Sequence, residues 1–267
     1  MLLINQFIGN DTLISAIRSL GLTANLKLCL DAADPASYTS GQSWLDTSGN
    51  GYDFFLGADG SATASDPTFV GPVGSQGAYW SFDGNNYFTY DTTNETWMQN
   101  LHKNNAVLTI VGFYRQASQT TDRMQFLGDT GSGGTGIEFY IASSAKLTCN
   151  VRNGASEELS ATSDSALGLS AWHMVGISLT EATGVGGGFL YVDGDYAQVG
   201  ASNTFNATYA SPSSGNALST MQLAALGGSA LPSASGQRLA CLAVWSSALT
   251  KANLDSVWAA MRGRFGL

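Results

Sequence analysis

The feature that most constrains this chain is an alternation of apolar and polar side chains that begins at Leu26 and continues to Trp245. Successive side chains of a β-strand point to opposite faces, so the pattern predicts strands buried on one face. Clusters of Gly, Ser, Asn and Asp between the apolar runs indicate turns. Many short strands with few helices are typical of a sandwich or a barrel. The expected strands are 26–30, 79–82, 87–90, 107–115, 124–127, 137–141, 146–151, 172–179, 189–192, 221–226 and 239–245.

A short amphipathic helix is expected before the first strand, over residues 11–20. Asn10 or Asp11 can cap its start, and Gly21 supplies a stop signal. A helix of this length is not stable alone, so it needs a surface to pack against. Its apolar stripe consists of Leu13, Ile14, Ile17 and Leu20.

A second helix is expected after the last strand. Thr250 is a good N-cap, and Leu249 and Leu254 have the spacing of a hydrophobic staple. Gly263 is expected to end this helix. The buried stripe is expected to contain Leu254, Val257, Trp258 and Met261.

The strand expected over residues 107–115 is apolar on both faces. Leu108 and Ile110 lie on one face, and Val111 and Phe113 lie on the other. A strand of this kind belongs in the middle of a sheet that is covered on both sides. We therefore expect two stacked sheets together with a further cover, or with a partner chain in its place.

The charge of the chain excludes several classes of partner. It has 20 Asp and Glu residues against 11 Lys and Arg residues, which gives a net charge of −9. Binding to nucleic acid through phosphate contacts requires a dense basic face. We therefore expect neither nucleic acid nor an anionic membrane as a main partner. The densest basic cluster, Arg262-Gly263-Arg264, is interpreted as cations that complete the C-terminus of the last helix.

The cysteines and histidines predict neither a disulfide framework nor a metal site. Cys29, Cys149 and Cys241 are odd in number and lie in apolar runs, so we expect buried free thiols. His102 and His173 are the only histidines, which leaves no recognisable site for a soft metal.

The start of the chain lacks the cationic region and the long apolar run of a secretory signal. No apolar stretch approaches the ~20 residues that a membrane-spanning helix needs. We therefore expect that the protein does not insert into a membrane. We also expect that it matures in a reducing cytoplasm.

Six segments carry a resemblance, in this order along the chain: LCLDAADPASY (28–38), WLDTSGNGYD (44–53), FDGNNYF (82–88), WHMVGIS (172–178), LYVDG (190–194) and AVWSSALT (243–250). They resemble the laminin-G-like, concanavalin A-like lectin fold. The resemblance covers residues 26–265 and implies an all-β, two-sheet antiparallel jelly-roll sandwich with a short N-terminal helix and a C-terminal helix. The "FDG" and "VDG" segments also contain Asp-Gly pairs, which favour hairpin turns.

The opening LDAADPASY (30–38) is similar to a variant found in proteins of tailed bacteriophages, where lectin-like sandwiches decorate heads or tails. This resemblance implies location in a virion, other virion proteins as partners and a homo-oligomer. Residues 1–24 are expected to form an N-terminal extension with the short helix, and residues 25–267 the jelly-roll domain. The extension is expected to dock on a neighbouring subunit or on the particle, or else to cover the sheet of its own chain.

The residues do not predict a catalytic site. Related glucanases resemble Glu-x-Asp-x-x-Glu on one strand, and none of the five glutamates here has that spacing. Glu138 is interpreted as an outward polar position of a strand, and His173 as a hydrogen-bonded structural residue. His102 is interpreted as the end of a surface helix that starts with a capping box at residues 92–95.

The sequence predicts no cofactor. Among the cofactors considered, calcium fits the sequence best. Asp46, Ser48, Asn50 and Gly51 match the first half of an EF-hand-type loop, but Gly57 stands where the closing Glu is needed. A turn held by side chains is the alternative for this loop, and Asp83 and Asn85 are likewise assigned to a hairpin turn.

Together these observations predict a non-enzymatic structural protein of a tailed-phage virion. It would decorate the capsid or form part of a head fibre or tail, and it would present an adhesive surface. The alternative is a carbohydrate-binding module or glycan-binding adhesin that acts through the concave face of one sheet. A glycoside hydrolase with unrecognised carboxylates is a third hypothesis. The sequence assigns no catalytic, metal-binding or ligand-binding residues.

Overall fold

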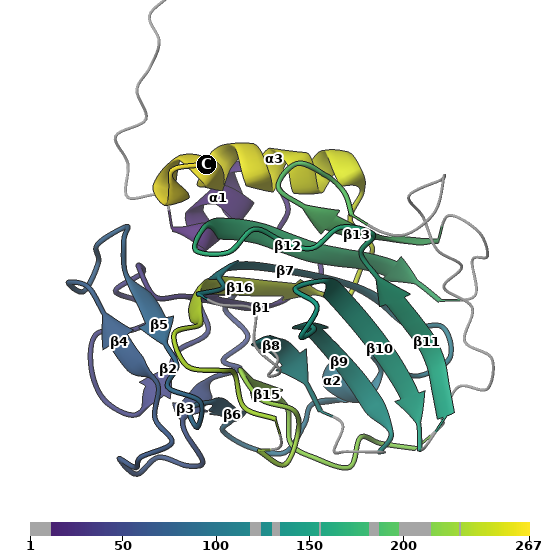
Figure 1. The fold of residues 1–267 in the computed structure, drawn as a ribbon, viewed down its shortest axis with the longest axis horizontal. Helices are drawn as coiled ribbons and strands as arrows, with labels where there is room; N and C mark the ends of the chain where they lie inside the picture. Colours follow the sequence, from purple (N-terminus) through teal and green to yellow (C-terminus); the bar gives the residue numbers. More distant parts are fainter. Residues whose placement is uncertain are drawn as a thin grey trace, which may run out of the picture.

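The computed structural model describes residues 12–117, 124–129, 134–154, 156–181, 187–197, 215–229 and 231–267. Two antiparallel sheets face each other, and helices α1 and α3 lie over the outer face of one of them (Figure 1). This arrangement confirms the two-sheet sandwich with helices near both ends of the chain. The helices are α1 (Leu13–Ser19), α2 (Thr96–Gln99), α3 (Lys251–Met261) and the 3₁₀ helix η1 (Arg262–Phe265).

The sheet beneath the two helices is called sheet A, and the opposite sheet is called sheet B. In sheet A, β1 also pairs with β16 beside the path of the other strands. Sheet A runs β14 (Asp195–Tyr196), β13 (Gly188–Val192), β12 (Trp172–Thr180), β7 (Val107–Arg115), β16 (Arg238–Trp245), β5 (Tyr79–Ser81) and β4 (Thr68–Val70), with β1 (Leu26–Asp31). Sheet B runs β11 (Ser156–Thr162), β10 (Leu147–Asn153), β9 (Gly136–Ile141), β8 (Met124–Gly128), β15 (Gln222–Leu223), β6 (Phe88–Tyr90), β3 (Phe54–Leu56) and β2 (Ser43–Trp44).

All eleven expected strands are present, most of them within two residues of their expected ends. The expectation over 221–226 is too long, because β15 contains only two residues. The alternation did not predict β11, which is an edge strand with polar side chains on both faces. It also did not predict β2, β3, β4 and β14, which are two or three residues long. Two or three residues are too few to show a recognisable alternation of apolar and polar side chains.

The strand expected to be covered on both sides is β7, which lies between β12 and β16 in the middle of sheet A. Leu108 and Ile110 belong to the core between the sheets. Val111 and Phe113 belong to a second core, which α1 and α3 cover. The further cover is therefore supplied by this chain's own helices.

Helix α1 buries the apolar side chains that the sequence predicted, among them Leu13 and Ile17, but its N-cap is a different residue. Thr12 is the N-cap and accepts a hydrogen bond from the N–H of Ser15. Asn10 and Asp11, the expected caps, lie outside the described residues. Gly21 adopts a left-handed conformation with φ +69°, which agrees with its expected role as a stop.

Helix α3 starts at its expected cap, where Thr250 and Asn253 form a reciprocal capping box. The expected stop at Gly263 is wrong, because the chain continues through η1 and the left-handed terminator is Gly266 at φ +70°. The three cysteines are free and buried, as expected. Among the described residues, no helix has the length and apolar character needed to span a membrane.

The two Asp-Gly turns have different roles. Asp193 and Gly194 both have positive φ and connect β13 to β14 as the expected hairpin. The expected hairpin at Asp83 is wrong, because β5 belongs to sheet A and β6 to sheet B. Asp83 instead accepts the N–H of Asn85 in a turn that takes the chain from one sheet to the other.

Candidate functional site

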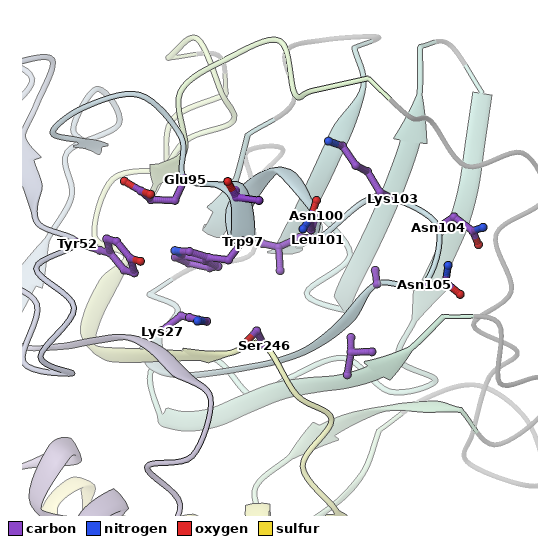
Figure 2. A pocket seen from close by; sticks show the side chains of 13 residues that line it. Lys27, Tyr52, Glu95, Trp97, Asn100, Leu101, Lys103, Asn104, Asn105 and Ser246 are labelled. Carbon is purple, nitrogen blue, oxygen red and sulfur yellow. The ribbon is translucent and has the colours of Figure 1, made fainter.

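A cleft of about 700 Å³ opens at the end of the sandwich where α2 lies beside β1, β7 and β16 (Figure 2). Its volume falls within the range that is usual for ligand pockets. Its walls come from segments far apart in the chain. The lining residues are Lys27, Tyr52, Glu95, Thr96, Trp97, Asn100, Leu101, Lys103, Asn104, Asn105, Ala106, Val107 and Ser246.

Two aromatic rings form one part of the cleft. The ring centroids of Tyr52 and Trp97 are 5.6 Å apart, and the rings are tilted by 39°. Trp97 is 9% exposed and packs into the core, whereas Tyr52 is half-buried. The ring of Tyr90 contacts that of Tyr52 edge-on, with 6.3 Å between the ring centroids. The core therefore holds the two rings in place, while part of their surface remains open to a ligand.

The loop that holds Tyr52 is stabilised by Asp46. Its carboxylate oxygens accept the N–H groups of Cys29, Ser48 and Tyr52 at 2.9, 2.9 and 3.3 Å. Asn50 donates to the carbonyl oxygens of Leu26 and Lys27, which ties the loop to β1. The residues that resembled a calcium loop are therefore hydrogen-bonded to one another and to β1, and they form a turn that positions Tyr52. No group of three or more metal-ligating side chains occurs among the described residues.

Polar groups surround the rings. In Figure 2, Glu95 and Lys27 lie on opposite sides of Trp97, and Asn104 and Asn105 lie farther along the cleft. Glu95 accepts a hydrogen bond of 2.9 Å from the hydroxyl of Tyr90. The cleft therefore offers a carboxylate, an ammonium group and amides next to aromatic surface.

The phenols near the cleft remain protonated at neutral pH. Burial raises the pKa of Tyr52, and the carboxylates of Glu95 and Asp46 raise it further. Burial and the hydrogen bond to Glu95 raise the pKa of Tyr90 well above its usual value. Neither hydroxyl group is therefore available as a base at neutral pH.

Glu138 is not the solvent-facing residue that the sequence predicted. Only 2% of its surface is exposed, and it accepts hydrogen bonds from Asn150 at 3.1 Å and from Arg152 at 3.2 Å. Arg152 also donates to Glu157 at 2.7 Å. The fold thus brings two glutamates near one arginine on sheet B. Asn150 also donates to the hydroxyl of Tyr140, which completes a buried polar network.

His102 does not lie at the end of a surface helix. Helix α2 begins after Glu95 and contains no capping box, and His102 follows it as a fully buried side chain. Burial lowers the pKa of His102, and its Nε2 lies 3.1 Å from the carbonyl oxygen of Gly215. The expected surface position is therefore wrong, because the ring packs inside the protein.

His173 is the hydrogen-bonded structural residue that the sequence predicted. Its Nδ1 lies 2.5 Å from a carboxylate oxygen of Asp193, and its Nε2 lies 2.9 Å from the carbonyl oxygen of Gly168. Both partners are acceptors, so the doubly protonated ring satisfies both. Burial lowers the pKa of His173, but Asp193 and the Gly168 carbonyl outweigh this effect, and the net shift is upward from 6.5.

Because the folded pKa of His173 lies above its unfolded value of 6.5, its stabilising effect is complete below pH 6.5 and lost as pH rises through the folded pKa. We expect Asp193→Asn to remove roughly 1–2 kcal/mol of the free energy of unfolding at pH 5.5 and much less at pH 9. Urea unfolding of both proteins at the two pH values measures the difference.

The comparison with the variant is needed because burial raises the pKa of Asp129 to about 7, and that group titrates in the same range. An NMR titration of the imidazole rings provides the direct check. A midpoint for His173 below 6.5 would contradict the prediction.

The two arginines near residue 262 differ in their roles. Arg262 is the C-cap of α3, which agrees with the expected cation at the C-terminus of the last helix. Arg264 lies in η1, but its side chain forms a buried ion pair that was not expected. Its Nη1 lies 2.8 Å from Asp31, and both side chains are buried. Arg262 is exposed.

Comparison with known proteins gives a family and a set of similar folds. The Laminin_G_3 family model, described as concanavalin A-like lectin/glucanases superfamily, matches residues 82–255. No curated protein matches the sequence of this chain.

Solved structures with similar folds include both enzymes and binding domains. A Trypanosoma rangeli sialidase in complex with sialic acid is 12% identical with a TM-score of 0.55, and the match covers 90% of this chain and 34% of that one. The receptor binding domain of botulinum neurotoxin C/D mosaic serotype is 10% identical with a TM-score of 0.60, and the match covers 89% and 51%. The botulinum neurotoxin serotype D binding domain is 11% identical with a TM-score of 0.58, and the match covers 91% and 52%.

The chain thus spans about a third of the sialidase and about half of the toxin domains. At these identities the likeness shows the fold alone. The family model, in contrast, matches well over half of the sequence and includes strands of both sheets. The two-sheet sandwich and this match agree: the chain belongs to the concanavalin A-like lectin/glucanases superfamily.

Proposed function

We propose that this protein is a non-enzymatic carbohydrate-binding protein whose ligand occupies the cleft beside α2. The observation that supports this most is the pair of rings, Tyr52 and Trp97, inside a cleft of about 700 Å³. One face of a pyranose ring presents C–H groups, and these pack against aromatic surface. A cleft that lacked such rings would have to bind a sugar through hydrogen bonds alone, in competition with water.

The polar lining suits the hydroxyl groups of a sugar. Glu95 accepts hydrogen bonds, Lys27 donates them, and the amides of Asn100, Asn104 and Asn105 can do both. Such groups at the rim of an aromatic surface fix the orientation of a ligand, whereas the rings supply contact area.

The arrangement of carboxylates favours binding over hydrolysis. Glycosidases use two carboxyl groups that flank the scissile bond. Glu95 is the only carboxylate among the described residues that line the cleft. On sheet B, Glu138 and Glu157 are both paired with Arg152, and neither lines the cleft.

The virion assignment is part of the same proposal. The opening at residues 30–38, which is similar to that of phage proteins, supports a place on the capsid, head fibre or tail of a tailed phage. There the protein would form a homo-oligomer, contact other virion proteins and bind a glycan of the host cell surface. Capsid, portal or tail genes beside its own gene would support this, and a neighbourhood without any of them would contradict it.

Substitution in the cleft tests the binding proposal. The wild-type protein is first screened on an array of bacterial-surface and other glycans, and the strongest glycan is then titrated by calorimetry. We expect Tyr52→Ala to weaken binding at least tenfold, because it removes the more exposed of the two rings. That loss corresponds to about 1.4 kcal/mol.

Tyr87→Ala is the matched control, because Tyr87 is also half-buried but does not line the cleft. It should bind the glycan as the wild type does. The proposal is wrong if no glycan binds, or if Tyr52→Ala binds as tightly as the control.

A further inference from the structure

Two arginines lie side by side on the outer face of sheet A, at the end opposite the cleft. Arg115 ends β7 and Arg238 begins β16, and the two residues face each other directly in the antiparallel register. Directly opposed side chains have Cβ atoms about 4.5–5.5 Å apart. Like charges in this position repel each other, so the pair lowers the stability of the sheet.

Neither arginine has a carboxylate partner among the described residues. Arg115 donates through Nε to the carbonyl oxygen of Ser170 at 2.9 Å. The guanidinium of Arg238 lies 4.7 Å from the ring centroid of Tyr79, and its buried Nε makes no hydrogen bond. By contrast, Arg152 and Arg264 both bind carboxylates. The described part of this acidic chain thus provides no countercharge for two neighbouring, half-buried cations.

Aromatic rings frame the pair. Trp172 is the cross-strand neighbour of Arg115 on β12, and Tyr79 lies beside Arg238 on β5. Their ring centroids are 5.8 Å apart, and the ring of Phe265 lies 5.2 Å from that of Trp172. All three rings are half-buried. The guanidinium groups therefore sit in a fixed, partly desolvated setting in which an anion is bound more strongly than at an open surface.

We infer that Arg115 and Arg238 form a binding site for the carboxylate group of a small ligand. Guanidinium groups are planar and present paired N–H donors that match the two oxygens of a carboxylate. One carboxylate would offset the repulsion between the two cations and accept hydrogen bonds from guanidinium N–H groups that have no acceptor among the described residues. The rings of Tyr79 and Trp172 would flank the body of the ligand. This site is independent of the cleft and of the function proposed for it.

A carboxylate of this kind can belong to an acidic sugar or to a free organic acid, and calorimetry with three probes separates these sources. The probes are a trimer of galacturonic acid, the organic acid citrate, and a neutral galactose trimer, all at the same ionic strength. We expect one or both acids to bind and the neutral trimer not to bind at this site. The acid that binds more tightly identifies the source.

The variants are Arg115→Met, Arg238→Met and the charge-conserving Arg238→Lys. We expect each methionine variant to weaken binding of the acid at least tenfold, and Arg238→Lys to weaken it because an ammonium group cannot bind a carboxylate in a bidentate manner. Lys146→Met, which removes one positive charge at the start of β10, is the control and should bind as the wild type does. The inference is overturned if neither acid binds, or if the control loses as much affinity as the arginine variants.

Thermal unfolding without ligand distinguishes this site from a structural pair. Because the two cations repel each other, Arg238→Met should unfold at the wild-type temperature or above it. A clearly lower unfolding temperature would show that Arg238 stabilises the sheet, and it would overturn the inference even if binding were lost.

Discussion

Replacing Arg264 with Met is expected to lower the free energy of unfolding by about 3–5 kcal/mol, because it leaves a buried carboxylate without its countercharge. The Nη1 atom of Arg264 lies 2.8 Å from Asp31, and the two side chains are 2% and 0% exposed. Replacing both partners of a buried ion pair with apolar residues often changes stability little. Removing only one partner is strongly destabilising, because the remaining buried charge cannot be solvated.

The loss of stability caused by Arg264→Met should be concentrated around Asp31, because this residue connects separate parts of the fold. Its carboxylate also accepts the N–H of Leu13, the first residue of α1, at 2.7 Å, and the N–H of Ala33 at 2.9 Å. One side chain therefore connects α1, β1 and η1. We expect amide hydrogens of α1 to exchange faster in the variant.

Urea unfolding measures the change, and Arg262→Met is the matched control. Arg262 lies two residues away in the same 3₁₀ helix and is exposed, so its loss should alter stability by no more than about 0.5 kcal/mol. The double variant Asp31→Asn with Arg264→Met should recover part of the loss, because it removes both charges. A single variant as stable as the control would show that the ion pair is not important.

Replacing Trp80 with Ala is expected to cost about 3–5 kcal/mol, the usual range for truncation of a buried aromatic side chain. Trp80 is fully buried. Its ring lies 4.6 Å from that of Tyr38, 5.1 Å from Phe69, 5.2 Å from Phe88 and 5.7 Å from Trp44, measured between centroids. Because Trp80 belongs to sheet A and Phe88 to sheet B, the ring helps to hold the two sheets together.

Chemical denaturation compares this variant with Trp258→Ala. Trp258 is half-buried on α3, outside the core between the sheets, so its truncation should cost less than half as much. If Trp80→Ala loses less than about 1 kcal/mol, the cluster of rings does not stabilise the sandwich as we infer.

Long strands and both terminal helices could be predicted from the sequence because their signals are local. The strand β7 has its expected bounds. A run of nine residues that is apolar on both faces fits few structures other than a central strand. The edge strand β11 could not be found in this way. Its sequence SEELSAT contains few apolar residues, and its hydrogen bonds to β10 define it as a strand.

The candidate sites were largely invisible in the sequence. Tyr52 stands in a recognised turn motif, and only the fold shows that this turn presents its ring to a cleft beside Trp97. Glu138 was singled out for its chemistry but was expected to face solvent, and the partners that bury it come from another strand. A signal that could have drawn attention to α2 is the run of asparagine and lysine at residues 103–105.

The sequence by itself determined the long strands and showed which helices need a cover, because those properties depend on the order of neighbouring side chains. Only the tertiary structure decided which distant residues meet. Asp31 and Arg264 are 233 positions apart and form one ion pair, and Arg115 and Arg238 become neighbours through strand pairing alone. The physical reason is that strand register and the packing of the two layers are set by the burial of the whole core. No short stretch of sequence therefore indicates which distant side chains become neighbours.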